Sequence, residues 1–254
     1  MSEKKFVEKI KKQLCKDFTK KDRKGLYAKI QKMMAYNSNK IEGSTLTSEQ
    51  TASLFDTGSI YALEDTIYRA KDIEEMNGHF KMFNYMLETI DEKLSEDIMK
   101  KYHYHLKVGV FEDMANGYLI GEYKNRLNQV SDIETALPKE VPSLMTELVA
   151  NYINKENKTL EDILNFHADF EYIHPFQDGN GRVGRMILFR ECLKNDIIPV
   201  IIKDETKVQY YHVLHETQIN KNLQPFVEYV KKQQKIFTKE IGRYINDYEQ
   251  SCIK

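Results

Sequence analysis

The chain alternates between stretches with apolar residues at helical spacing and short polar breaks. Apolar positions three and four residues apart predict helices over Lys4–Leu14 and Gly25–Tyr36, and Gly43 stands where the second helix would end. Thr47, followed by Gln50 three residues later, has the pattern of a capping box and predicts the start of another short helix. The first part of the chain is therefore expected to be helical.

The rest of the chain follows the same pattern, apart from one region. Further helices are expected over Tyr61–Ile90, Ser95–Leu106, Ser143–Ile153, Leu160–Tyr172, Arg182–Lys194, Glu205–Ile219 and Phe226–Tyr248. Glycine and proline punctuate residues 107–142, and the alternating stretch Leu127–Ile133 within them predicts a short β-hairpin. The pattern predicts an all-α fold with one small β-hairpin.

Composition supports a charged, mostly helical protein and excludes several classes. Of 254 residues, 41% are hydrophobic and 30% charged, with 11 glycines and 5 prolines. The net charge of −1 predicts no nucleic-acid partner. No apolar run approaches the roughly 18 residues of a membrane span, and no secretory segment is found. Cys15, Cys192 and Cys252 are isolated, which is typical of reduced thiols and predicts a cytoplasmic location.

One segment, residues 174–185, departs from this pattern and reads His-Pro-Phe-Gln-Asp-Gly-Asn-Gly-Arg-Val-Gly-Arg. Pro175 must end the preceding helix, the glycines mark a tight turn, and a new helix follows at once. The first turn of a helix has free N–H groups and a partial positive charge, which favour an anion. The segment therefore predicts an anion-binding loop at a helix start.

The residues around this turn favour a polyphosphate. Gly179 and Gly181 let the backbone approach a ligand closely. Arg182 and Arg185 share one helix face at the positive end, where each cation costs roughly 0.3–1 kcal/mol. Such an arrangement is explained if a polyphosphate neutralises the two arginines.

Two more side chains suggest chemistry. Asp178 is expected to be a lone carboxylate among phosphates and arginines, which suits Mg²⁺. His174 directly precedes the loop and has a side chain suited to removing a proton from a hydroxyl.

Other classes of protein fit parts of the pattern. Each feature alone has a structural explanation: a turn for the glycines, a helix cap for His174, and a solvated helix face for the arginines. These explanations do not account for all three occurring within twelve residues. Glu171 and His174, with His167 nearby, have the Glu-x-x-His spacing of a di-iron site, which needs a second such pair that the sequence lacks. A non-catalytic binding module, such as a transcriptional partner, would be expected to lose His174 or an arginine. Because the sequence reaches only Lys254, an appended winged helix is not expected.

At every defined position, residues 174–185 match the signature His-x-Phe-x-(Asp/Glu)-Gly-Asn-(Gly/Lys)-Arg-x-x-Arg. The chain thus resembles the Fic (filamentation-induced-by-cAMP) family. The resemblance implies a Fic-type helical bundle, with a helical extension over 1–60 and the catalytic domain over 61–254. It also implies transfer of AMP from ATP to a Ser, Thr or Tyr hydroxyl of a protein. Gly181 resembles the AMP-transferring majority, whereas a Lys there resembles members that transfer phosphate.

The resemblance assigns roles to the residues of the signature and beyond. It implies that His174 is the general base and that Asp178 is the ligand of Mg²⁺ or Mn²⁺. The phosphates would be bound by a nest formed by Gly179, Asn180 and Gly181. Arg182 and Arg185 would bind the β- and γ-phosphates. Phe176 matches a buried loop anchor, and Leu127–Thr135 a flap that pairs with the target peptide. Tyr210 and Tyr211 are expected either to border the adenine or to pack in the core. Lys124 departs from the family, since relatives often have Arg there.

A second motif implies regulation. Ser38-Asn39-Lys40-Ile41-Glu42-Gly43 matches the family's inhibitory pattern, (Ser/Thr)-x-x-x-Glu-(Gly/Asn). Ser38 and Glu42 share a helix face, and Gly43 ends the helix beside them. Glu42 is expected to pair with Arg185 in bidentate geometry and to occupy the place of the γ-phosphate.

Several points stay open at this stage. The same fold also supports removal of AMP, with Glu42 helping to activate water, or transfer of another phosphate-linked group. The target protein is not defined and self-modification is one option. The family often self-associates, so a homo-oligomer is among the expected states.

Overall fold

The described residues lie almost entirely in helices and loops, which confirms the predicted all-α class. A computed structural model describes residues 2–61, 67–130 and 133–252. Its helices are α1 Glu3–Thr19, α2 Leu26–Ile41, α3 Ser48–Thr57, α4 Ala70–Glu88, α5 Glu96–Lys107, α6 Phe111–Ala115, α7 Val141–Ile153, α8 Leu160–Ile173, α9 Asn180–Lys194, α10 Lys207–Asn220 and α11 Gln224–Cys252. A 3-10 turn, Asp204–Thr206, precedes α10.

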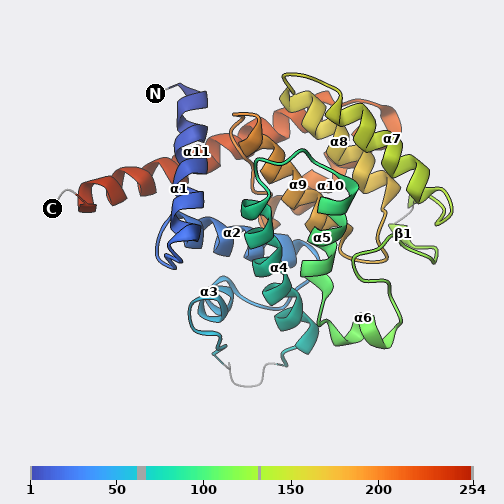
Figure 1. Ribbon diagram of the computed structural model, residues 1–254, viewed down its shortest axis with the longest axis horizontal. Coiled ribbons are helices and arrows are strands. Elements are labelled where there is room, and N and C mark those ends of the chain that lie inside the picture. The colour runs from blue at the N-terminus through green and yellow to red at the C-terminus, as the bar shows by residue number, and fades with distance from the viewer. Residues whose placement is uncertain (1, 62–66, 131–132, 253–254) are drawn as a thin grey trace.

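Helix α9 lies at the centre of the bundle and positions the signature segment. It packs against α1, α2, α4, α5 and α8 (Figure 1). Nearly every residue from Arg182 to Leu193 is buried, so this helix is covered on all sides rather than amphipathic. Since α9 begins within the signature, the loop before it lies where several helices meet.

The close packing of α4 against α5 depends on one glycine. A Cβ atom built on Gly78 would lie 1.9 Å from the carbonyl oxygen of Leu106. Only a residue without a side chain allows this approach of two helix backbones. The contact brings Glu75, one turn before Gly78, level with Lys107 at the end of α5.

Local signals placed several helix ends correctly. Thr47 Oγ1 accepts a hydrogen bond from Gln50 N, and Gln50 Oε1 accepts one from Thr47 N, so the predicted capping box is confirmed. Gly43 follows α2 with a φ of +85° and ends that helix as expected. At the end of α8, His174 adopts a left-handed conformation and Pro175 follows.

Two predicted spans differ from the structure. The helix expected over Tyr61–Ile90 begins only at Ala70, and residues 62–66 lie outside the described ranges. Arg69 is extended there, and its guanidinium donates to the carbonyl oxygen of Gly43 at 2.6 Å. The region expected to be a loop contains the short helix α6.

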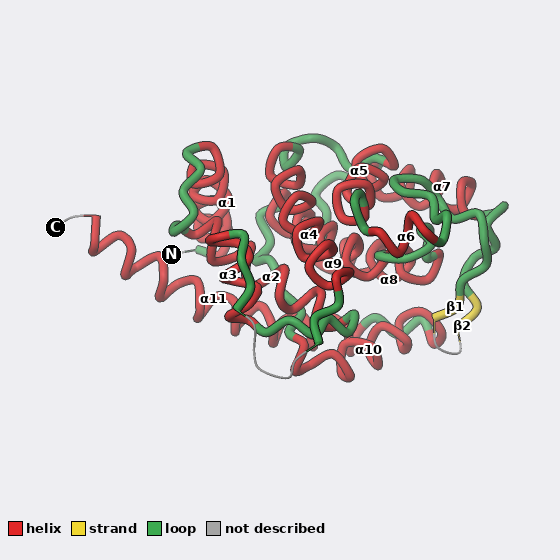
Figure 2. Tube along the Cα trace, turned by 90° about the horizontal axis from the view of Figure 1, so that it is seen from below, coloured by secondary structure: helices red, strands yellow, loops and turns green. Residues whose placement is uncertain are grey.

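A β-ribbon of two strands, each two residues long, lies at one edge of the molecule (Figure 2). Strands β1 Gln129–Val130 and β2 Ile133–Glu134 pair antiparallel, while the tip of the predicted hairpin, 131–132, is outside the described residues. At the opposite edge, the C-terminal part of α11 extends beyond the other helices in both views (Figures 1 and 2).

Helices from both parts of the chain share one hydrophobic core. Val7 and Ile30 from the first sixty residues are fully buried in the same cluster as Phe83 and Phe189. A boundary between 1–60 and 61–254 therefore stays a prediction. Among the described helices, none combines the length and the apolar content that a membrane span requires.

Candidate active site

The signature loop is closed by its own asparagine. Asn180 Oδ1 accepts a hydrogen bond from Phe176 N, and Asn180 Nδ2 donates to Phe176 O, both at 2.7 Å. Gly179, with a φ of +83°, forms the N-cap of α9. The Asn180 side chain is thus engaged within the loop, and the backbone N–H groups of the first turn of α9 are the groups suited to an anion.

His103 on α5 supports this loop and was not predicted. Its ring stacks on buried Phe176, with 4.1 Å between ring centroids. Nδ1 accepts from Gly121 N at 2.9 Å, so Nε2 carries the proton and donates to the carbonyl oxygen of Asp178 at 3.1 Å. Burial lowers the pKa of His103 to about 3, which keeps the ring neutral, and the two hydrogen bonds fix the tautomer.

His174 is arranged as a neutral base. Its Nδ1 lies 3.3 Å from the carbonyl oxygen of Glu171, and because a carbonyl oxygen only accepts, Nδ1 carries the proton. Nε2 is therefore the atom with a free lone pair. Burial lowers the pKa of His174 to about 4, so the ring is unprotonated near neutral pH.

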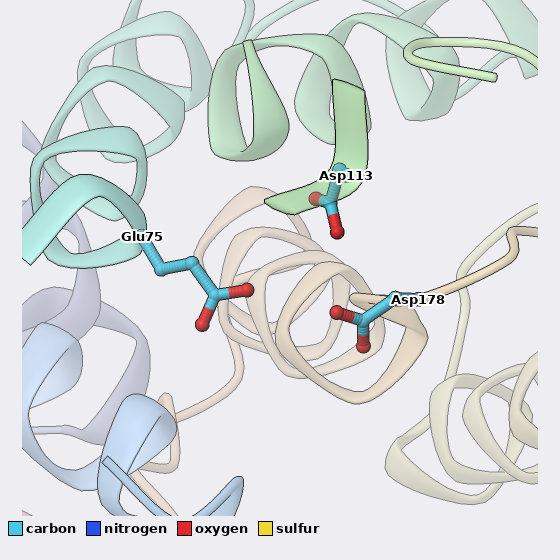
Figure 3. Close-up of side chains that lie close together, drawn as sticks. All are labelled: Glu75, Asp113 and Asp178. Carbon is cyan, nitrogen blue, oxygen red and sulfur yellow. The ribbon is translucent and has the colours of Figure 1, made fainter. Parts of the chain in front are cut away.

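Asp178 is not a lone carboxylate, and that prediction was wrong. Its carboxylate lies beside those of Glu75 on α4 and Asp113 on α6, with one oxygen of each within 4.8 Å of the others (Figure 3). The ammonium of Lys107 lies among them, with Nζ 2.5 Å from Glu75 Oε1, 2.6 Å from Asp113 Oδ2 and 2.7 Å from Asp178 Oδ2. We call Glu75, Lys107, Asp113 and Asp178 the Lys107 cluster.

The cations decide the ionisation of this cluster. Burial would raise the pKa of Asp178, but Arg182 and Lys107 outweigh it and hold that pKa well below its usual range. The same two cations lower the pKa of Glu75 against the effect of burial. At Asp113, burial raises the pKa and the opposing effect of Lys107 is smaller. Asp178, whose side chain is about one-third exposed, is thus ionised.

Both signature arginines already have carboxylate partners from other helices. Arg182 pairs with Glu75 at 2.5 Å and more loosely with Asp178 at 3.5 Å. Arg185 NH2 donates to Glu42 Oε1 at 2.7 Å, while its Nε donates to Ser38 Oγ at 3.0 Å. The pairing of Arg185 with Glu42 was expected, whereas the pairing of Arg182 with Glu75 was not predicted.

The Glu42–Arg185 contact also differs in form from the expected bidentate pair. Only one oxygen of Glu42 accepts a hydrogen bond from Arg185. The guanidinium donates its other hydrogen bonds to the hydroxyl and the carbonyl oxygen of Ser38. Gly181 makes room for this contact, since a Cβ atom there would lie 2.4 Å from Glu42 Oε1. The predicted inhibitory motif and the signature thus meet side by side.

The two tyrosines lie in different environments. Tyr210 is 1% exposed, packs between aromatic rings of the core, and its hydroxyl is 2.8 Å from His167 Nε2. This geometry favours the core alternative for Tyr210. Tyr211 is 44% exposed and stays the better candidate for a contact with adenine.

The alternative di-iron reading finds no support among the described residues. His167 Nε2 lies 4.0 Å from Glu171 Oε1, and His174 contacts only the backbone of Glu171. The single acidic group that could hold a metal in the described part of the chain is the one in the Lys107 cluster.

The base of the β-ribbon is joined to the signature loop. Lys124 Nζ donates to Asn128 Oδ1 at 2.6 Å and to Thr135 Oγ1 at 2.8 Å, and Lys124 N donates to Pro175 O. Asn128 Nδ2 in turn donates to Phe176 O. Lys124, the residue that departs from the family pattern, thus holds the predicted flap against the loop.

Replacing Lys124 by methionine is expected to loosen the ribbon without changing ATP affinity. A lost charged hydrogen bond costs roughly 1.5–3 kcal/mol, so amides at 127–130 and 133–135 should exchange about tenfold faster or more. Hydrogen exchange followed by mass spectrometry measures this. Lys124→Arg, which keeps the charge, is the matched control, and equal exchange in both variants would contradict the assignment.

The residues present fit a divalent cation that arrives with phosphate. Mg²⁺ in such sites typically uses one or two carboxylates plus phosphate oxygens. Asp178 has a 35% exposed carboxylate, ionised and next to the first turn of α9. Glu75 and Asp113 are too buried, and too closely bound to Lys107, to offer their oxygens without losing that contact.

Comparison with known proteins agrees with this geometry. Residues 93–192 match the model of the Fic/DOC family. The chain is 27% identical over 219 residues to protein adenylyltransferase fic-1 of Caenorhabditis elegans, a match covering 84% of this chain and 41% of the relative. It is 25% identical over 200 residues to protein adenylyltransferase Fic of Nematostella vectensis, covering 78% of this chain and 45% of the relative. The chain thus matches less than half the length of these relatives.

Solved structures share the architecture. A Fic-domain-containing signaling protein from Bacteroides thetaiotaomicron superposes with a TM-score of 0.73 at 25% identity, over 92% of both chains. A fragment of Fic-1 from Caenorhabditis elegans gives 0.67 at 20% identity, over 98% of this chain and 72% of the fragment. The match of residues 93–192 to the Fic/DOC model and the shared architecture support a Fic family protein.

Proposed function

We propose that this protein transfers AMP from ATP to a Ser, Thr or Tyr hydroxyl of a protein. The observation that carries the proposal is the neutral His174, whose Nε2 accepts no hydrogen bond from any described residue. It stands at the start of a loop that ends in the free N–H groups of α9 and is flanked by two arginines. The relatives named adenylyltransferases support the same chemistry.

The residues divide the reaction between them. His174 Nε2 takes the proton of the target hydroxyl, and the oxygen forms a bond to the α-phosphorus of ATP. The bond from that phosphorus to the bridging oxygen breaks, and pyrophosphate leaves with the electron pair. The N–H groups of Asn180 and Gly181, with Arg182 and Arg185, hold the β- and γ-phosphates. Gly179 contributes its left-handed turn, since its own N–H donates to Asp178 Oδ1.

Asp178 would hold the Mg²⁺ or Mn²⁺ that accompanies ATP. When bound, the ion neutralises charge on the phosphates and so favours departure of pyrophosphate. His103 fixes the backbone of Asp178, and Lys107 fixes one of its carboxylate oxygens.

The contact of Glu42 with Arg185 supports an inhibitory role for α2. An arginine bound to Ser38 and Glu42 is not free for a γ-phosphate, so ATP either competes with Glu42 or binds in an unreactive pose. Residues 127–135 would place the target segment by strand pairing. The division into an extension, 1–60, and a catalytic domain, 61–254, belongs to the same proposal.

The test is the identity of the transferred group. The Glu42→Gly chain is incubated with Mg²⁺ and ATP labelled at either the α- or the γ-phosphate, with itself and lysate proteins as acceptors. Label should be incorporated from the α-position and not from the γ-position. Incorporation of the γ-label would replace AMP transfer by phosphate transfer, and loss of AMP from pre-labelled protein would favour removal.

The transfer rate should stay nearly constant from pH 8 to about 5 and fall only as the pH approaches 4. Burial lowers the pKa of His174 from 6.5 to about 4. The imidazole is therefore protonated, and unable to act as the base, only as the pH falls to about 4. Initial rates of the Glu42→Gly chain against pH measure this. An acid limb centred near 6.5, the value for an exposed histidine, would contradict the buried environment.

A further inference from the structure

Lys107 occupies the position that a metal ion would take among three carboxylates. Its side chain is 1% exposed, and Nζ lies within 2.5–2.7 Å of one oxygen each from Glu75, Asp113 and Asp178. The three carboxylates converge from α4, α6 and the loop before α9 (Figure 3). The contacts with Glu75 and Asp178 are hydrogen bonds, and the contact with Asp113 is an ion pair.

Asp113 shows that the arrangement is built around the ammonium. Both of its carboxylate oxygens are buried without a hydrogen bond to a described residue, and the described cation within ion-pair distance is Lys107. An uncompensated buried carboxylate is strongly destabilising. The position of Asp113 is therefore explained by Lys107.

The carboxylates of this region are largely compensated before any metal arrives. Glu75, Asp113 and Asp178 face the cations Lys107, Arg182 and Lys71, and Lys71 Nζ lies 3.8 Å from Asp178 Oδ2 and 3.1 Å from Glu112 Oε1. A divalent ion entering this set alone would leave uncompensated positive charge. ATP supplies the negative charge that makes its entry favourable.

We propose that Lys107 is a positioning residue that excludes divalent cations from the nucleotide-free cluster and holds Asp178 ready for the ion that accompanies ATP. The second half of this proposal rests on the proposed function. Lys107 fixes Oδ2 of Asp178, and Gly179 N donates to Oδ1 at 2.7 Å, so the carboxylate plane is set from both sides. Metal and nucleotide then bind together rather than in sequence.

The experiment is a titration of Mn²⁺ into nucleotide-free protein, followed by electron paramagnetic resonance. Wild type should bind no Mn²⁺ at this cluster below about 1 mM. Lys107→Met leaves three oxygens around the vacated position and should bind one Mn²⁺ at least tenfold more tightly than wild type. Lys107→Met/Asp113→Asn should lose most of that gain, because one of the three carboxylates is removed.

Two results would overturn the proposal. One is Mn²⁺ binding by wild type that Asp113→Asn abolishes, since it would show that Lys107 does not exclude the ion. The other is a Lys107→Met chain that binds Mn²⁺ no more tightly than wild type. Its melting temperature would then neither fall with the substitution nor rise with added Mn²⁺. Lys107→Met should melt below wild type and regain stability with Mn²⁺, so an unfolded chain that Mn²⁺ does not rescue also counts against it.

These measurements do not depend on catalysis. If no AMP transfer is found while Lys107→Met gains its Mn²⁺ site, the proposed function fails and the exclusion of metal by Lys107 stands. If transfer is found and the Mn²⁺ site is not gained, the reverse holds.

Discussion

Replacing Glu42 by glycine is expected to raise the rate of AMP transfer at least tenfold. The substitution removes the carboxylate that binds Arg185 at 2.7 Å and leaves the contacts of Ser38 with the same arginine in place. A charge-assisted hydrogen bond contributes about 1.5–3 kcal/mol, which corresponds to roughly a 10- to 150-fold change in the equilibrium that Glu42 controls. Glu42 is the C-cap of α2, where glycine costs little.

Initial rates with α-labelled ATP measure the effect, and ATP binding is measured beside them. Glu49→Gly, at an exposed position in the first turn of α3, is the matched control and should leave the rate unchanged. An unchanged rate in Glu42→Gly, with ATP bound as in wild type, would contradict inhibition through Arg185.

Replacing His174 in the Glu42→Gly chain is expected to lower transfer by about 10²- to 10⁴-fold while ATP affinity stays within about twofold. The size of the loss is that of a general base, and the base acts after ATP is bound. His174 also holds a left-handed conformation, with a φ of +53°, between α8 and Pro175. Asparagine tolerates this conformation better than alanine, so His174→Asn is tested together with His174→Ala.

His212→Ala, at an exposed position of α10, is the control for loss of an imidazole alone. Single-turnover rates and ATP dissociation constants are compared across the three variants. If His174→Asn loses ATP binding as well as transfer, the role of His174 is structural.

Features set by neighbouring residues could be predicted from the sequence. The capping box at Thr47, the end of α2 at Gly43 and the loop from Pro175 to Gly181 each depend on residues within one or two helical turns. The position of Ser38 and Glu42 on one helix face followed from the same short-range geometry. That these residues meet Arg185 was expected from the family resemblance alone.

The partners of the signature residues could not be predicted in this way. Glu75 and Asp113 lie far from Asp178 in the sequence, and helix packing brings the three together. For Glu75, the close approach of α4 to α5 at Gly78 contributes. His103 and Lys107 are four residues apart, on the buried face of α5. The sequence did contain a signal for this helix. It places two potentially charged side chains on the apolar face of an otherwise amphipathic helix, which is typical of a functional site.

Short elements escaped prediction for a different reason. Helix α6 has five residues, too few for a hydrophobic period to emerge between Gly109 and Gly117. The apolar residues between Tyr61 and Ala70 continue the pattern of α4, but Arg69 is held extended by its bonds to Gly43 and Asp72. Here a tertiary contact overrides the local preference for a helix.

The narrow space beside Gly181 limits how this sequence can diverge. Any side chain at 181 would meet the Glu42 carboxylate, whose Oε1 lies 2.4 Å from the place of the Cβ atom, so the ends of the Glu42 and Arg185 side chains would have to shift. The effects of substitutions at 42 and 181 are therefore expected to depend on each other. A lineage that acquires a larger residue at 181 changes the geometry of the contact between α2 and Arg185 in the same step.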